Sequence, residues 1–192
     1  MKKYKNLTIL LIGLMLIIFS FFILNNKLTK HKDKTVTSNS VSSSYSNKES
    51  VRQELIDATL KKSDGTELHL QEFNDKPIFI VEWASWCPHC QKELPVIENL
   101  YQKYKDKIHF VMVNATDGQK ETSASAKLYI ETKKFTFPYY LDEKLSFAKQ
   151  MNITEVPTML FSTKSGQVLK TVKEEISQTD LEKELLSLIS HQ

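Results

Sequence analysis

The sequence predicts an α/β fold in which a mixed central sheet is flanked by helices. Two uninterrupted apolar runs, IFIV at residues 78–81 and IHFVMV at residues 108–113, are typical of strands that are buried on both faces. Each run is followed by a segment with apolar residues at helical spacing, and the chain then closes with a hairpin and a last helix. This order of elements favours a sheet with both parallel and antiparallel neighbours.

An N-terminal hairpin opens the predicted domain. Asp64 and Gly65 lie between two alternating segments, which is a good hairpin signal. The strand at 78–81 comes next, and a helix is predicted to begin near Cys87. The apolar positions of that helix recur at helical spacing; they are Leu94, Ile97, Leu100, Tyr101 and Tyr104.

The second half of the domain follows the strand at 108–113. Residues 120–134 are predicted to form a helix. Ser165 and Gly166 separate the apolar segments TMLF and QVLKTV, which predicts a second hairpin. Thr179 and Glu182 are spaced as a capping box that would begin the last helix. The expected inward positions are Ala124, Leu128 and Ile130 in the earlier helix, and Leu181, Leu185, Leu186 and Ile189 in the last one.

The N-terminal 26 residues have the composition of a membrane anchor. A lysine-rich tail at residues 1–6 precedes an uncharged apolar run, and about 18 such residues suffice to cross roughly 30 Å of hydrocarbon as a helix. We therefore predict a cytoplasmic tail at residues 1–6 and a single transmembrane signal anchor at residues 7–26, with the remaining chain on the extracytoplasmic side of the cell membrane. A cleaved signal peptide is the alternative, but the run ends in Asn-Asn-Lys without a small-x-small cleavage site.

Residues 27–50 are predicted to be a flexible linker. They are rich in Ser, Thr, Asn and Lys and lack apolar periodicity, so they cannot bury enough surface to offset the entropy of ordering. A basic patch on the membrane surface is the alternative interpretation. The domain itself is predicted at residues 51–192. A net charge of +3, with many lysines near the two ends of the chain, does not indicate a nucleic-acid partner.

Both cysteines of the chain, Cys87 and Cys90, lie in the segment VEWASWCPHCQKELP. The pair falls where the 78–81 strand gives way to a helix, and the unpaired N–H groups of a helix N-terminus favour thiolate over thiol. With two residues between them, Cys87 can be exposed at the first turn, and Cys90 can attack a mixed disulfide that Cys87 has formed. The spacing and position indicate thiol-disulfide exchange.

The cysteine pair also has three structural interpretations. A structural disulfide would close a very short loop and stabilise little. A zinc site would need four ligands, and the remaining histidines are scattered, so no metal site is predicted. Two inert buried cysteines would not need the flanking Trp86 and Pro88. We favour redox chemistry, for which no other cofactor is expected because the Cys87–Cys90 disulfide carries the electrons itself.

The segment FIVEWASWCPHCQKELP resembles the strand, the Trp-Cys-x-x-Cys motif and the helix of the thioredoxin superfamily. Residues 55–190, approximately, are similar to the extracytoplasmic branch typified by TlpA and ResA, through the opening hairpin, the FTFPYYLDEKLSFAKQMNI stretch and EVPTMLF. The resemblance implies a thioredoxin fold with an N-terminal β-hairpin and a TlpA-type insertion. It also implies the activity of a thiol-disulfide oxidoreductase.

Further residues take roles from this resemblance. Pro157 matches the cis-proline that lies against the active-site disulfide, which would leave the backbone of Val156 free to pair with an extended substrate segment. Without the resemblance, Pro157 is equally a proline that opens a strand. Glu93 matches a glutamate that handles protons near the thiols, and its alternative is a solvated first-turn acid favoured by the helix dipole.

One position departs from the family pattern. Thioredoxins carry a buried acid that deprotonates the resolving thiol, and Val81 occupies its position here. Glu82 is the next residue and is expected to point to the opposite face of the strand. It is a displaced proton acceptor, an edge-facing polar residue or part of a substrate surface, and we favour a role outside catalysis.

The residues between the cysteines bear on the direction of electron flow. A donor beside Cys87 stabilises its thiolate and therefore the reduced protein, which then acts as an oxidant. His89 supplies such a donor, and the Pro-His dipeptide is similar to that of DsbA-like disulfide oxidases, although the stretch before Pro157 is too short for their helical insertion. The motif therefore predicts a protein disulfide oxidase.

Such an oxidase would act on cysteine-containing secreted or membrane proteins, and a membrane redox partner would have to reset its cysteine pair. The first alternative is a ResA/TlpA-like reductase that serves cytochrome c maturation or thiol repair. The second, from another class, is a non-catalytic binding or chaperone module in which the thiols are incidental.

Overall fold

The computed structural model describes Met15, Leu55 and residues 57–190. The predicted cytoplasmic tail and linker, and all of the predicted anchor except Met15, lie outside the described residues. Within the described part, no helix combines the length and the apolar character that crossing a membrane requires.

In the described part of the chain, seven strands form one sheet in the order β2-β1-β5-β4-β3-β6-β7. The central strand β3 runs parallel to β4 and antiparallel to β6, while β1–β2 and β6–β7 are antiparallel hairpins. The predicted mixed sheet is confirmed. The strands are β1 (Thr59–Lys62), β2 (Glu67–His69), β3 (Ile78–Trp83), β4 (His109–Asn114), β5 (Tyr139–Leu141), β6 (Thr158–Ser162) and β7 (Val168–Val172).

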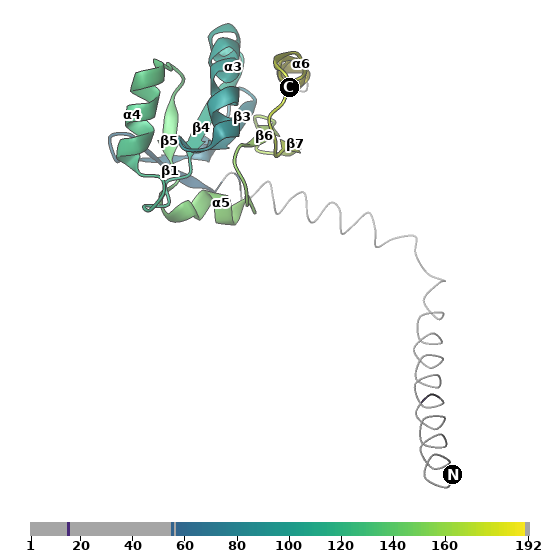
Figure 1. Cartoon of the computed structure of the whole chain (residues 1–192). Coiled ribbons are helices and arrows are strands. Elements are labelled where there is room, and N and C mark those ends of the chain that lie inside the picture. The colour runs from purple at the N-terminus through teal and green to yellow at the C-terminus, as the bar shows by residue number, and fades with distance from the viewer. Residues whose placement is uncertain (1–14, 16–54, 56, 191–192) are drawn as a thin grey trace, which may run out of the picture. The chain divides into compact units, whose positions relative to one another are not determined.

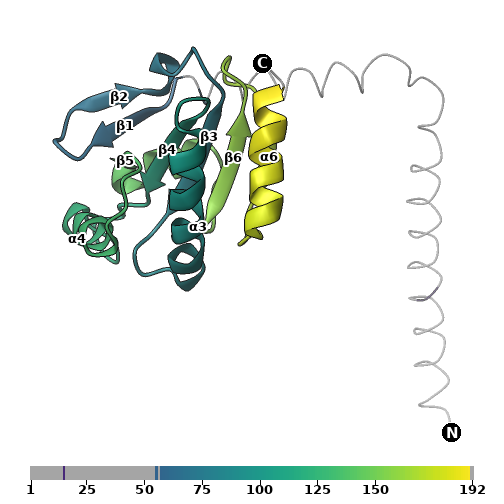
Figure 2. The same cartoon turned by 90° about the horizontal axis from the view of Figure 1, so that it is seen from above.

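Helices cover both faces of the sheet. Figure 1 shows α5 on one side of the strands and α3, α4 and α6 on the other, and Figure 2 shows α3 between α4 and α6. The helices are α3 (Pro88–Tyr104), α4 (Ser123–Lys133), α5 (Ser146–Gln150) and α6 (Gln178–Ser190), with 3-10 turns at Leu70–Glu72 and Glu143–Leu145.

The alternation of side chains along β3 explains why two cores form. All six residues of β3 are buried, as the uninterrupted apolar run predicted. Phe79, Val81 and Trp83 pack in the cluster that includes both cysteines and the inward residues of α3, α4 and α6. Ile78 and Ile80 pack in the second cluster, with Phe147 of α5. The thiols therefore belong to the larger, three-helix side of the domain.

The prediction for α4 was wrong in its start and in two of the three inward positions, whereas Ile130 is buried as predicted. The helix begins at Ser123, because the Asp117 carboxylate accepts N–H bonds from residues 119–121 and holds them in a turn. Ala126 and Ile130 are the buried residues of the helix, whereas Ala124 and Leu128 are exposed. Leu128 was misassigned because apolar residues occur on both faces of this short helix.

The predicted cap of the last helix was also wrong. Helix α6 begins two residues earlier than a cap at Thr179 would allow, and Ser177 Oγ accepts the N–H bond of Asp180. Glu182 instead accepts a hydrogen bond of 2.6 Å from the hydroxyl of Tyr104 and pairs with Lys103, both on α3. A tertiary contact between two helices therefore uses the acid that the local pattern assigned to a cap.

Two elements were not predicted individually, β5 and α5. Each is short, so neither carries enough residues to show a clear period. Helix α5 is held at its start by Asp142, whose carboxylate accepts N–H bonds of 2.8 and 2.9 Å from Phe147 and Ala148. This helix forms one side of a hollow next to the thiols.

Candidate active site

The two thiols lie at the N-terminus of α3, as predicted. Cys87 is the N-cap residue of the helix, and its Sγ accepts an N–H bond of 3.3 Å from Cys90, one turn later. Both cysteines are free thiols. The N-cap geometry aims a backbone donor at the sulfur that would carry negative charge as a thiolate.

The expected exposure of Cys87 was wrong. Its residue is only 3% exposed, and Cys90 is fully buried. The cover comes from the loop before β6: the Cys87 thiol donates a hydrogen bond of 3.3 Å to the carbonyl oxygen of Val156. The peptide bond between Val156 and Pro157 is cis, as the resemblance implied. The structure thus brings Cys87, Cys90, Val156 and Pro157 together.

The buried position of Cys90 controls its protonation. Burial raises the pKa of the Cys90 thiol, and the hydrogen bond and charge of Cys87 raise it further. Because Cys90 holds its proton firmly, it does not compete with Cys87 for the role of the first nucleophile. This difference in environment favours the predicted roles, with Cys87 as the attacking and Cys90 as the resolving sulfur.

Glu93 is buried rather than solvated. Its residue is 2% exposed, Oε2 accepts an N–H bond of 3.1 Å from Ile176, and Oε1 has no hydrogen-bond partner in the described part of the chain. Burial raises the pKa of Glu93, the bond from Ile176 opposes this, and the charge of Glu175 adds to it. A carboxyl with a raised pKa and a free oxygen is chemically suited to proton transfer.

The raised pKa of Glu93 predicts how stability depends on pH. A carboxyl whose pKa is higher in the folded state than in the unfolded state stabilises the fold at low pH. That contribution is lost as pH rises from the unfolded value, about 4.3, through the folded one. We expect the free energy of unfolding of the wild-type protein to fall relative to that of Glu93→Gln over this range, in urea titrations at a series of pH values.

Glu98 offers a matched control on the same helix. Although burial opposes it, hydrogen bonds from Gln102, Thr136 and Phe137 hold the pKa of Glu98 below its ordinary value. The wild-type protein should therefore lose stability relative to Glu98→Gln as pH falls through that lowered pKa, which is the opposite slope. Parallel pH profiles for the two variants would contradict the account of Glu93.

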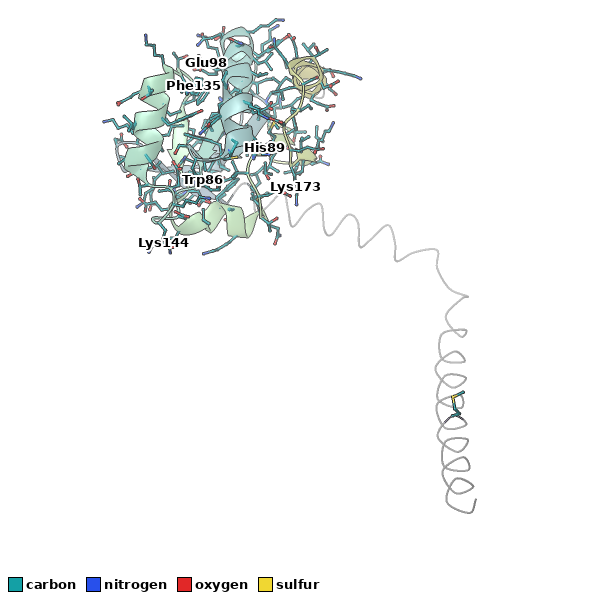
Figure 3. The ribbon with its side chains drawn as sticks, viewed as in Figure 1. Trp86, His89, Glu98, Phe135, Lys144 and Lys173 are labelled. Atoms are coloured by element: carbon teal, nitrogen blue, oxygen red, sulfur yellow. The ribbon has the colours of Figure 1, made fainter. Side chains whose placement is uncertain are left out.

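Trp86 directly precedes Cys87, and His89 lies between the two cysteines in the sequence. Figure 3 labels both side chains near the start of α3. His89 Nδ1 lies 3.4 Å from a carboxylate oxygen of Glu175, to which Lys92 also binds at 3.2 Å. Trp86 is 40% exposed, and the ammonium of Lys120 lies 3.4 Å from its ring centroid. Pro88 is the first residue of α3, where its missing N–H costs nothing.

Glu121 is a buried residue of the site that sequence reasoning missed. Its carboxylate accepts hydrogen bonds from the backbone N–H and the hydroxyl of Ser85, at 3.1 and 2.8 Å. It also accepts bonds of 3.2 Å from Asn114 and from Ser125. The loop that leads into Cys87 is thereby joined to β4 and α4. The sequence carries no local signal for this, because the partners are up to 36 residues apart.

Val81 and Glu82 point to opposite faces of β3, as expected. Val81 packs in the cluster that holds the thiols, so no acid of β3 reaches Cys90 from there. Glu82 lies on the other face and is only 1% exposed, so the idea of an edge-facing polar residue was wrong. Glu82 is buried because β3 is a central strand: Thr158 of β6 and Val113 of β4 lie beside it in register.

Most of the chain matches a known protein family. The family model described as Redoxin matches residues 50–186. A thiol-disulfide oxidoreductase ResA of Bacillus thuringiensis subsp. konkukian (strain 97-27) is 31% identical over 122 residues, which cover 64% of this chain and 69% of the relative.

Solved structures agree with this match. The crystal structure of StoA from Bacillus subtilis has a TM-score of 0.59 at 25% identity and covers 68% of this chain and 98% of that one. The structure of MTB dsbF in its mixed oxidised and reduced forms has a TM-score of 0.62 at 25% identity, with coverages of 70% and 97%. The thioredoxin-like arrangement of sheet and helices that the sequence predicted is therefore confirmed.

Proposed function

Because this chain belongs to the Redoxin family and is a thiol-disulfide oxidoreductase of the ResA/StoA type, we propose that it works as a reductase of protein disulfides outside the cytoplasm. The Pro-His motif alone favours a disulfide oxidase, which would take electrons from its substrates, and this is the second candidate function. The similarity to proteins named ResA supports the reductase alternative instead.

The observation that carries the proposal is the position of His89. A strong oxidant needs positive charge or a donor at the thiolate of Cys87, because that interaction stabilises the reduced form. Here the imidazole Nδ1 lies 3.4 Å from the carboxylate of Glu175, which Lys92 also contacts at 3.2 Å, so this donor is directed towards Glu175 rather than towards the thiolate. The reduced form then gains less stability from His89, which favours a protein that keeps its own disulfide and gives electrons away.

The mechanism begins with Cys87. Its thiolate attacks one sulfur of a substrate disulfide, forms a mixed disulfide and releases the other substrate sulfur as a thiolate, which takes up a proton. Cys90 then loses its proton and attacks the Cys87 sulfur, which releases the second substrate thiol and leaves the Cys87–Cys90 disulfide. The substrate has gained two electrons and the protein has lost two. Glu93 is the proposed acceptor of the Cys90 proton, and the Val156–Pro157 loop would hold the substrate strand.

The remaining parts of the proposal concern location and partners. The apolar run at residues 7–26 supports a membrane anchor with the domain outside the cytoplasm. The substrates would be cysteine-containing secreted or membrane proteins. A membrane thiol carrier would return two electrons to the Cys87–Cys90 disulfide after each turnover.

Removing the Glu175 carboxylate tests the account of His89. We expect Glu175→Gln to raise the equilibrium reduction potential of the cysteine pair by about 10 to 20 mV, because the imidazole is then free to stabilise the Cys87 thiolate. The potentials of His89→Ala and of the double variant complete the cycle. In the His89→Ala background, Glu175→Gln should shift the potential much less. An equal shift in both backgrounds would show that Glu175 does not act through His89.

A further inference from the structure

A hollow of about 370 Å³ lies next to the thiol site. One wall includes Trp86, which directly precedes Cys87, and another includes Val156, whose carbonyl oxygen accepts the bond from the Cys87 thiol. Ala148 of α5 contributes to a third wall. A substrate held at the reacting sulfur would therefore have side chains within reach of this hollow.

The lining of the hollow is acidic. Three of the described residues that line it are acidic: Glu82, Asp117 and Glu155. No described residue of the lining is basic. Backbone N–H bonds, the strongest of them from Glu121, lower the pKa of Asp117, so its carboxylate is charged at neutral pH. The one ion pair of Glu155 within the described part is a long contact of 3.9 Å with Lys173. The ammonium of Lys120, which lies over the Trp86 ring, offsets part of the charge of Asp117. The remaining acidic charge of the lining still favours a cation.

Glu82 is a buried acid in the lining of this hollow. Neither of its carboxyl oxygens has a hydrogen-bond partner within the described residues, although the residue is 1% exposed. Burial first, and then the negative charge and the close approach of the Asp142 carboxyl, raise the pKa of Glu82 well above its ordinary value. An unsatisfied buried polar group destabilises a fold, so its presence in a central strand points to a partner that arrives from outside.

On the basis of the proposed function, we propose that the hollow is a subsite for a lysine or arginine side chain of the substrate protein. The basic residue would lie about one to three positions from the cysteine that reacts with Cys87, at roughly 3.3 Å per residue of an extended segment. Its N–H groups supply the donors that Glu82 lacks, and Glu82 gives up its proton to solvent as the ion pair forms. Asp117 and Glu155 add to the attraction at the rim.

Matched peptide disulfides test the subsite. One set carries arginine at the first, second or third position on either side of the reacting cysteine, and the control set carries glutamine there. We expect kcat/KM of the wild-type protein to be about tenfold higher for the best arginine peptide than for its glutamine counterpart. In Glu82→Gln this ratio should fall towards one. Glu67→Gln, which removes a carboxyl from an exposed position of strand β2, should keep the ratio.

Binding of redox-inert peptides separates the subsite from the reaction. The same peptides with serine in place of cysteine are titrated into the full-length protein by calorimetry. Tighter binding of the arginine peptide by the wild-type protein, but not by Glu82→Gln, would support the subsite. If the wild-type protein bound the arginine peptide in this way but reduced neither peptide disulfide, only the proposed function would be refuted. Equal binding and equal turnover of the arginine and glutamine peptides by the wild-type protein would overturn the subsite.

Discussion

Cys87→Ser is expected to lower the rate of disulfide exchange by about 10³-fold or more, because no other group of the site can form the mixed disulfide. Cys90 cannot replace it, since that thiol is fully buried and burial raises its pKa. The measurement is the reduction of a disulfide-bonded substrate protein by the pre-reduced full-length chain. The serine is nearly isosteric, so the fold and the N-cap of α3 should survive.

Cys90→Ser is the matched variant for this experiment. It keeps the attacking thiol but removes the resolving one, so the mixed disulfide with the substrate should accumulate and be visible on a non-reducing gel. An enzyme is expected to lose exchange activity in Cys87→Ser and to accumulate the mixed disulfide in Cys90→Ser, whereas a binding module should show neither effect. If Cys87→Ser retained the biological activity of the chain, the thiols would be incidental and the binding or chaperone alternative would stand.

Glu121→Ala is expected to reduce the free energy of unfolding by about 3 to 5 kcal/mol, the second large effect. The carboxylate is fully buried and accepts four hydrogen bonds, so its removal leaves both donors of Ser85 without an acceptor. The loop before Cys87 should loosen as well, and the rate of exchange should fall with the stability. Urea unfolding at pH 7 and the substrate assay measure the two effects.

Glu121→Gln keeps one carbonyl acceptor in nearly the same place. Its free energy of unfolding should therefore fall by less than half as much as that of Glu121→Ala, and it should keep most of the wild-type exchange rate. If Glu121→Ala were as stable as the wild-type protein, the bonds to Ser85 would not hold the active-site loop. If Glu121→Gln were as destabilised as Glu121→Ala, the effect would depend on charge rather than on the hydrogen bonds.

The elements that could be predicted are those with strong local signals. The apolar run of β3 is buried on both faces, the helix after Cys87 buries Leu94, Ile97 and Leu100, and the turn at Gly65 has the positive φ that glycine adopts readily. Each of these follows from a pattern within about ten residues. The short strand β5 and the five-residue helix α5 have no comparable pattern, and their order depends on contacts made elsewhere.

The site was only partly predictable for the same reason. The spacing of the cysteines indicated their position at the helix start, but the contact of Cys87 with Val156 joins residues that are 69 positions apart in the chain. The partner of His89 is Glu175, which no nearby motif indicates. A motif specifies which groups are present, whereas the charges around them come from distant segments that the fold brings close.

The equilibrium reduction potential of Cys87–Cys90 in the full-length chain, measured against glutathione, tests the reductase proposal most directly. The reductase proposal predicts a value at or below about −250 mV, in the range of a protein that donates electrons. A value of about −120 to −180 mV would contradict the proposal and would make the chain a disulfide oxidase, as its Pro-His motif alone suggests.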